Sequence, residues 1–234
     1  MIAAARFGSW ERRVLRDALV VGLVTGAYGV SFGAVAVAAG LAVWQTSALS
    51  LFMFTGASQF AFAAEVAAGG SLGSAAATAV LLGSRNAFYG VRLAPLIAPR
   101  GWRRVAAAQV TLDESAAMSF GEREPDAARL AFWATGISVF VFWNLATLAG
   151  ALSSQLVADP RDLGLDAAGP AAFVALLAPR LRAGRPRLAA CVCGAVALSV
   201  FAFVPAGVPV LLAAVAAVAL GLARSRPGTK GGVA

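Results

Sequence analysis

Long apolar runs separated by short polar stretches make up almost the whole chain. No charged residue occurs in 18–64, 130–158 or 188–223. A helix that crosses a bilayer needs about 20 apolar residues, so the first and last of these runs are each long enough for two crossings. This pattern predicts membrane-spanning helices and argues against a soluble core.

The pattern predicts an all-α polytopic membrane protein with about six to eight hydrophobic segments, including re-entrant or discontinuous helices. The organisation we expect is a basic cytoplasmic leader over 1–17, a single transmembrane transport domain over 18–223 and a polar tail over 224–234. The individual segments are expected at 18–39, 47–68, 74–96, 105–120, 130–156, 167–181 and 188–223, the last divided into a helical hairpin by residues 205–209.

Small residues mark the first segment. Its glycines recur at three- and four-residue spacing, at Gly22, Gly26, Gly29 and Gly33. This spacing places them on one face of a helix, where they permit close approach of another helix. The sequence predicts a tight helix–helix contact there, and the same flat face would suit a helix from a partner subunit.

The second segment is interrupted near its middle by Gly56, Ala57, Ser58 and Gln59. Non-helical backbone at membrane depth is tolerated only where protein or a water-filled cavity covers it. One interpretation is therefore a broken or re-entrant helix whose free backbone groups and short polar side chains bind a substrate. The alternative is an unbroken helix in which Ser58 bonds to its own backbone and Gln59 faces another helix.

Charged and polar residues also lie within the third and fourth apolar stretches. Arg85 and Tyr89 share a helical face, with Asn86 one position further round, and a buried arginine needs a partner. The stretch 105–120 carries Asp113 and Glu114 and is too short and polar for a comfortable span. It is either a re-entrant element or a surface helix with solvated acids.

Arginines cluster in the leader and in 100–104, 180–187 and the tail, so the positive-inside rule places all four in the cytoplasm. Eight simple spans would leave 100–104 outside. The conflict disappears if 105–120 does not cross the membrane and if the segments between 47 and 96 cross a net odd number of times. Charge bias therefore predicts re-entrant elements in both regions.

Composition supports the membrane class and excludes several others. Sixty per cent of residues are hydrophobic and 13% are charged, with a mean hydropathy of +0.80. The net charge of +8 is scattered between apolar runs, which argues against nucleic-acid binding. The chain has no histidine, so imidazole metal sites and a Ser-His-Asp triad are excluded. Cys191 and Cys193 lie in an apolar run and are expected to be packing residues.

Several of these motifs, in this order, resemble the AzlC-type permeases, the larger subunit of bacterial branched-chain amino-acid exporters. The resemblance covers most of the chain. One departure concerns Asn86, since many relatives read Asn-x-Arg where this chain has GSRN over 83–86. The matching stretches are the glycine-rich first segment, FTGASQF over 54–60, RNAFYG over 85–90 with Pro95, TLDE over 111–114, and GLD over 164–166 with Pro170 and Phe173.

The resemblance implies proton-coupled export of branched-chain amino acids or methionine from a bacterial cytoplasm. It also implies a small hydrophobic AzlD-type partner subunit and no cofactor. The substrate-binding residues we expect are Gly56, Ser58, Gln59, Arg85, Asn86 and Tyr89. A passive pore and, more remotely, a membrane-embedded enzyme remain open, although no nucleophile–base pair or metal set is visible.

Proton coupling needs a group that titrates near neutral pH. Without histidine this must be a carboxyl whose pKa is raised by desolvation. The candidates are Asp113 and Glu114, with Glu65 third because it lies near a glycine turn. Asp113 and Glu114 point about 100° apart on a helix, so one is expected to face the cavity while the other pairs with Arg85.

Overall fold

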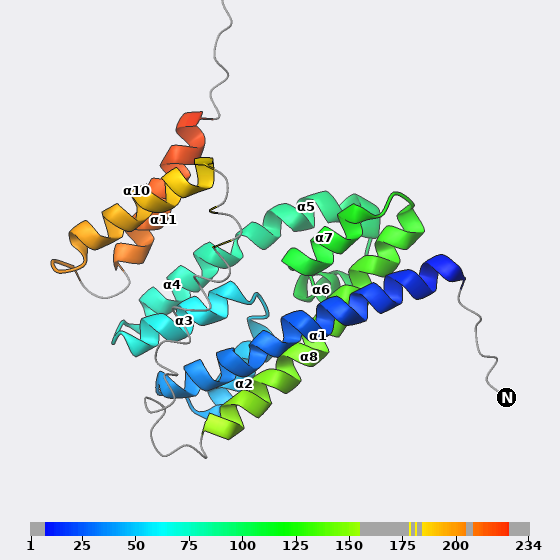
Figure 1. Ribbon diagram of the computed structural model, residues 1–234, viewed down its shortest axis with the longest axis horizontal. Coiled ribbons are helices and arrows are strands. Elements are labelled where there is room, and N and C mark those ends of the chain that lie inside the picture. The colour runs from blue at the N-terminus through cyan, green and yellow to red at the C-terminus, as the bar shows by residue number, and fades with distance from the viewer. Residues whose placement is uncertain (1–7, 155–177, 179–180, 182–183, 205–207, 225–234) are drawn as a thin grey trace, which may run out of the picture.

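The described part of the chain is helical throughout. The computed structural model describes residues 8–154, 178, 181, 184–204 and 208–224, and no strand occurs among them (Figure 1). The helices are α1 (Ser9–Ala38), α2 (Val43–Phe52), α3 (Ala57–Ala67), α4 (Leu72–Gly83), α5 (Arg85–Ile97), α6 (Arg103–Gln109), α7 (Asp113–Gly121), α8 (Pro125–Ser154), α10 (Gly184–Val200) and α11 (Val208–Arg224).

Two 30-residue helices, α1 and α8, pack along each other and form the framework of the fold (Figure 1). The glycines of α1 face α8, and a Cβ added to any of them would overlap α8. The opposing positions increase together along both helices, so α1 and α8 run parallel. These opposing pairs are Gly22 with Ser138, Gly26 with Phe142, Gly29 with Trp143, and Gly33 with Thr147.

The predicted tight contact at the glycine face is therefore confirmed, and the other helix belongs to the same chain. Gly150 of α8 completes the contact from the opposite side, against the backbone of Val30. The idea that this face serves a partner subunit is wrong, because α8 already covers it.

Replacing Gly33 by leucine should destabilise the protein strongly. Its side chain would have to enter the space that the Thr147 carbonyl and Ala151 backbone occupy. Overpacking of this kind costs on the order of 1–3 kcal/mol, and backbone cannot move aside as a flexible side chain does. We expect a melting temperature several degrees lower in detergent. Gly194→Leu on α10 is the control, since a Cβ there meets nothing within 4 Å; equal losses would contradict the packing account.

The second predicted segment is a helical hairpin, divided into α2 and α3 by residues 53–56. Helix α2 approaches the middle of the molecule and α3 returns toward the end of α1 (Figure 1). Ser50 near the tip of α2 donates to Thr147 of α8 (3.3 Å). The discontinuous interpretation is confirmed, and the break lies slightly before the position that the sequence indicated, with Ser58 and Gln59 in the first turn of α3.

A second hairpin, α6–α7, enters from the opposite end. Its tip, residues 110–112, packs against Gly136 and Val139 in the middle of α8. From there α7 runs back, and the Ser119 hydroxyl donates to the Ala128 carbonyl in the first turns of α8 (3.0 Å). With seven and nine residues, α6 and α7 are each too short to cross a bilayer.

Helices α4 and α5 provide the return between the parallel helices α1 and α8. Together they run from the α3–α4 turn to the end of the molecule at which α1 and α8 begin (Figure 1). The sequence predicted one segment over 74–96, whereas the structure divides it at Ser84. One return between two hairpins is compatible with the net odd number of crossings that the arginine distribution predicts.

Ionic contacts gather the termini of these elements at one end. Arg13 of α1 makes two 2.8 Å bonds to the Glu122 carboxylate before α8. Arg129 of α8 donates to the carbonyl of Leu96 at the end of α5 (2.8 Å). Helix α1 begins at Ser9, so most of the leader expected over 1–17 is continuous with the first span.

Only α1 and α8, among the described helices, are long and apolar enough to span a membrane alone. The expected number of six to eight segments is thus not confirmed, because several segments are divided or short. Helices α10 and α11, of 17 residues each, form the predicted C-terminal hairpin. The segment expected over 167–181 lies outside the described residues, apart from 178 and 181, as does most of the tail over 224–234.

Candidate functional site

The two hairpin tips meet beside the middle of α8. The Gln109 side-chain amide, at the end of α6, donates to the Leu51 carbonyl in the last turn of α2 (2.6 Å). Phe54 of the first tip and Leu112 of the second belong to one buried cluster with Trp143. Two interruptions that are far apart in sequence therefore share one level of the fold.

Gly56 makes the first tip possible. Its φ of 62° and ψ of −94° belong to backbone that residues with a Cβ rarely adopt. The turn leaves Ser58 and Gln59 fully buried in the first turn of α3. The Gln59 amide nitrogen donates to the Leu49 carbonyl (3.1 Å), so Gln59 and Gln109 hold the last turn of α2 from two sides.

The junction between α4 and α5 lies next to this tip. A Cβ on Gly83 would be 3.4 Å from the Ser58 hydroxyl and 3.9 Å from the Thr55 methyl group. Two residues later, Arg85 forms a 3.1 Å ion pair with Asp113, the first residue of α7. The predicted arginine–carboxylate pair is confirmed, and its partner is Asp113.

Thirteen buried side-chain atoms lack a hydrogen-bond partner within the described residues, and seven of them lie on α2, α4 and α8. The other six belong to the first tip, the start of α5 and the start of α7: Thr55 Oγ1, Ser58 Oγ, Gln59 Oε1, Arg85 Nε, Asn86 Oδ1 and Asp113 Oδ1. Leaving such groups unsatisfied costs about 1–3 kcal/mol each. These six include donors and acceptors that a polar ligand would satisfy. We call these six residues the polar cluster.

The second tip holds the acids at a helix N-terminus. The Ser115 hydroxyl accepts from the Leu112 amide (3.0 Å) and donates to the Val110 carbonyl (2.7 Å), which closes the turn before α7. Glu114 follows Asp113 in the first turn of α7. The two acids differ, because Asp113 is ion-paired with Arg85 whereas Glu114 forms no ion pair within the described residues.

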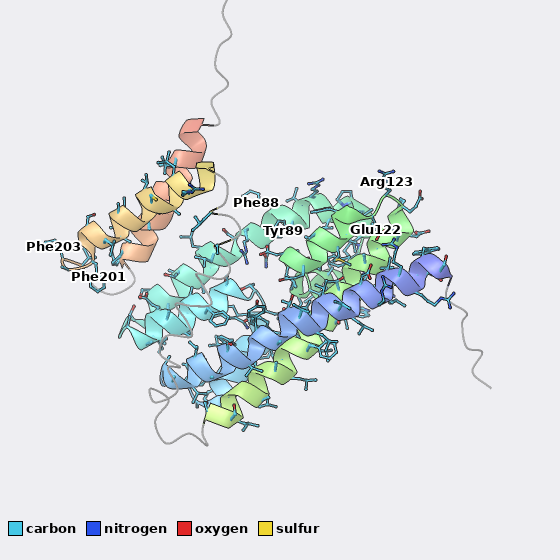
Figure 2. All side chains as sticks on the ribbon, in the orientation of Figure 1. Phe88, Tyr89, Glu122, Arg123, Phe201 and Phe203 are labelled. Carbon is cyan, nitrogen blue, oxygen red and sulfur yellow. The ribbon has the colours of Figure 1, made fainter. Side chains whose placement is uncertain are left out.

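The aromatic side chains near the polar cluster differ in burial. Phe54 and Phe60 belong to the buried cluster with Trp143, whereas Phe52 is 83% exposed and lies outside it. Tyr89 packs against the cluster formed by Leu93, Val110 and Phe132. Figure 2 shows Tyr89 on the side of α5 toward α7 and Phe88 on the opposite side.

The structure separates Glu65 from the other acids. It is buried at the far end of α3, where its carboxylate accepts from the Ser74 hydroxyl of α4 (2.6 Å). Nine residues of helix separate it from Gly56, about 13 Å at 1.5 Å per residue. Glu65 thus connects α3 to α4 across the turn between them. Its distance from the first tip does not support the expected role in proton coupling.

Gln109 is the residue that sequence reasoning missed. Its side chain connects the two hairpins. In the sequence it is only one of several polar residues in the stretch 105–120, which is too short and polar for a comfortable span. The available signal was its place just before Thr111 in a stretch too short to span, which matches Gln59 beside the first break. Within the described residues, no three histidine, cysteine, aspartate or glutamate side chains are placed to hold a metal ion together.

Comparison with protein families gives a match. A family model described as AzlC protein matches residues 20–157, which include the larger part of α1, both hairpins, the α4–α5 return and α8. No curated protein and no solved structure matches the chain. The matched region contains the whole polar cluster.

Proposed function

Because the chain belongs to the AzlC family of membrane transport proteins, we propose that it is a secondary transporter that exports branched-chain or similar apolar amino acids. The observation that carries the proposal is the polar cluster where two opposed hairpins meet. Discontinuous helices at mid-membrane are a recurring way to build substrate sites in secondary transporters, because they expose backbone groups.

The polar cluster suits the head of an amino acid. The first N–H groups of α3 and the guanidinium of Arg85 are donors for a carboxylate. The free oxygens of Gln59, Asn86 and Asp113 are acceptors for an ammonium group. Buried Phe54 and Phe60 beside the first tip supply apolar surface for the substrate side chain.

Glu114 is our candidate for the proton carrier. Asp113 is engaged by Arg85, so its charge is balanced on the protein. Glu114 follows Asp113 in the first turn of α7 and forms no ion pair within the described residues, so its charge is not balanced by an arginine and the carboxyl can take up and release a proton. Proton coupling and outward transport are both part of this proposal.

Orientation and assembly follow from the same premise. We place the end that carries Arg13, Arg100 and Arg103 in the cytoplasm of a bacterium, in accord with the positive-inside rule. We also retain a small hydrophobic AzlD-type partner subunit, supported by the resemblance alone, since the glycine face of α1 is occupied by α8.

Counterflow of labelled leucine in proteoliposomes tests the proposal. Saturable exchange with unlabelled leucine is expected, with Ser58→Ala and Gln59→Ala each raising the apparent substrate constant about five- to tenfold. That is the loss of roughly one hydrogen bond. Ser71→Ala at the α4 cap, away from the polar cluster, is the control. A flux that does not saturate would favour a passive pore, and substrate breakdown an enzyme.

A further inference from the structure

A second candidate binding region lies apart from the polar cluster, beside α6. A cavity of about 850 Å³ is bounded by α6, the loop between α5 and α6, and α8. Trp133, Ile137 and Phe140 of α8 give it apolar walls, while Arg100 and Arg103 stand in its lining on the loop side. A mostly apolar cavity with basic groups at one edge suits an amphiphile that carries negative charge.

The charges at this edge are uneven. Arg129 also lines the cavity, but it is neutralised by Asp126 (3.1 Å) and donates to a backbone carbonyl. Arg100 and Arg103 form no ion pair within the described residues. Trp102, between these two arginines and also in the lining, is 77% exposed. An exposed tryptophan between arginines is typical of the membrane–water interface.

A smaller cavity of about 470 Å³ lies on the other side of the same loop. It shares Arg100 with the first cavity, and its walls include Leu93, Ala107 and Phe132. Two apolar compartments therefore extend from one basic edge. Diverging acyl chains below a single phosphate have this form.

We propose that the two cavities hold one anionic phospholipid, with its phosphate on Arg100 and Arg103 and one acyl chain in each cavity. Exposed Val141, one turn after Ile137, continues the α8 wall beyond the first cavity, so a chain longer than the cavity still lies on apolar surface. This end of the molecule is the one placed at the cytoplasmic leaflet above, and basic pockets at that leaflet attract anionic head groups. The lipid would lie against α6, which ends at Gln109, and would contact no residue of the polar cluster.

Native mass spectrometry of the purified protein with phosphatidylglycerol and phosphatidylcholine tests the proposal. The unchanged protein should retain phosphatidylglycerol preferentially, and the double variant Arg100→Gln/Arg103→Gln should lose that preference by roughly tenfold or more. Arg123→Gln is the matched control, because Arg123 is an exposed arginine on the α7–α8 turn beside Glu122 and lines neither cavity (Figure 2). If Arg123→Gln loses the preference for phosphatidylglycerol as the double variant does, the preference arises from the net charge of the protein and not from Arg100 and Arg103. That result would overturn the proposed site.

A filling variant separates the remaining outcomes. Ile137→Trp leaves the arginines in place, and position 137 is half exposed, so the larger side chain is tolerated while it occupies the cavity. Retention of phosphatidylglycerol should fall severalfold. Unchanged retention would overturn the acyl-chain part of the proposal. Displacement of the lipid by millimolar glycerol phosphate would overturn the lipid assignment in favour of a soluble anion. Unaltered leucine counterflow in these variants keeps the test independent of the transport proposal.

Discussion

Arg85→Gln should reduce leucine counterflow by roughly 30- to 100-fold. The variant removes the partner of Asp113 at 3.1 Å and a donor for the substrate carboxylate at once. Breaking a buried pair costs several kcal/mol; about a third of each side chain is exposed here, so we take about 2–3 kcal/mol. Arg85→Lys keeps the positive charge but loses the planar guanidinium group. Its counterflow should lie between that of the unchanged protein and that of Arg85→Gln.

The double variant Arg85→Gln/Asp113→Asn distinguishes a binding role from a structural one. If the pair serves only to hold α5 against α7, removing both charges should restore stability and activity together. If Arg85 binds the carboxylate, stability should return while counterflow stays low. Melting temperature and counterflow are measured on the same preparations. Normal counterflow by Arg85→Gln itself would exclude Arg85 from the site.

Much of this arrangement could be predicted because polar residues are conspicuous in apolar sequence. Gly56 with Ser58 and Gln59 indicated a break, and the arginine distribution indicated two re-entrant regions. Both inferences rest on the cost of placing polar groups and arginines in hydrocarbon, which a single sequence exposes directly. The pairing of Arg85 with an acid followed from the same cost.

Contacts between elements could not be predicted in this way. The glycine face of α1 predicted a close contact with another helix, but the spacing of glycines does not indicate whether that helix is α8 or belongs to another chain. The junction at Ser84 was missed because single residues with low helix propensity, such as Gly83 and Ser84, also occur inside continuous helices, and a division there depends on what packs nearby. Glu65 was included among the candidate proton carriers because the sequence does not reveal that it accepts a hydrogen bond from Ser74. That bond depends on the geometry of the α3–α4 turn.

Glu114→Gln should abolish proton-driven accumulation of leucine while counterflow persists. Glutamine mimics the protonated carboxyl, so the substrate still binds and exchanges, but no proton can be released. We expect accumulation to fall to the level set by leucine exchange alone, at least tenfold below the unchanged protein. Asp113→Asn should instead lose both activities, because it leaves Arg85 without its partner. Glu65→Gln, at the α3–α4 turn, should keep both.

The pH dependence of leucine accumulation tests whether Glu114 carries the proton. If Glu114 carries the proton, leucine accumulation by the unchanged protein should depend on pH over the range in which this carboxyl titrates. Glu114→Gln should remove that dependence, because the side chain no longer binds or releases a proton. A variant that still accumulates leucine against its gradient with the pH profile of the unchanged protein would show that the proton travels elsewhere. The remaining acids of the matched region would then become the candidates, beginning with Glu65.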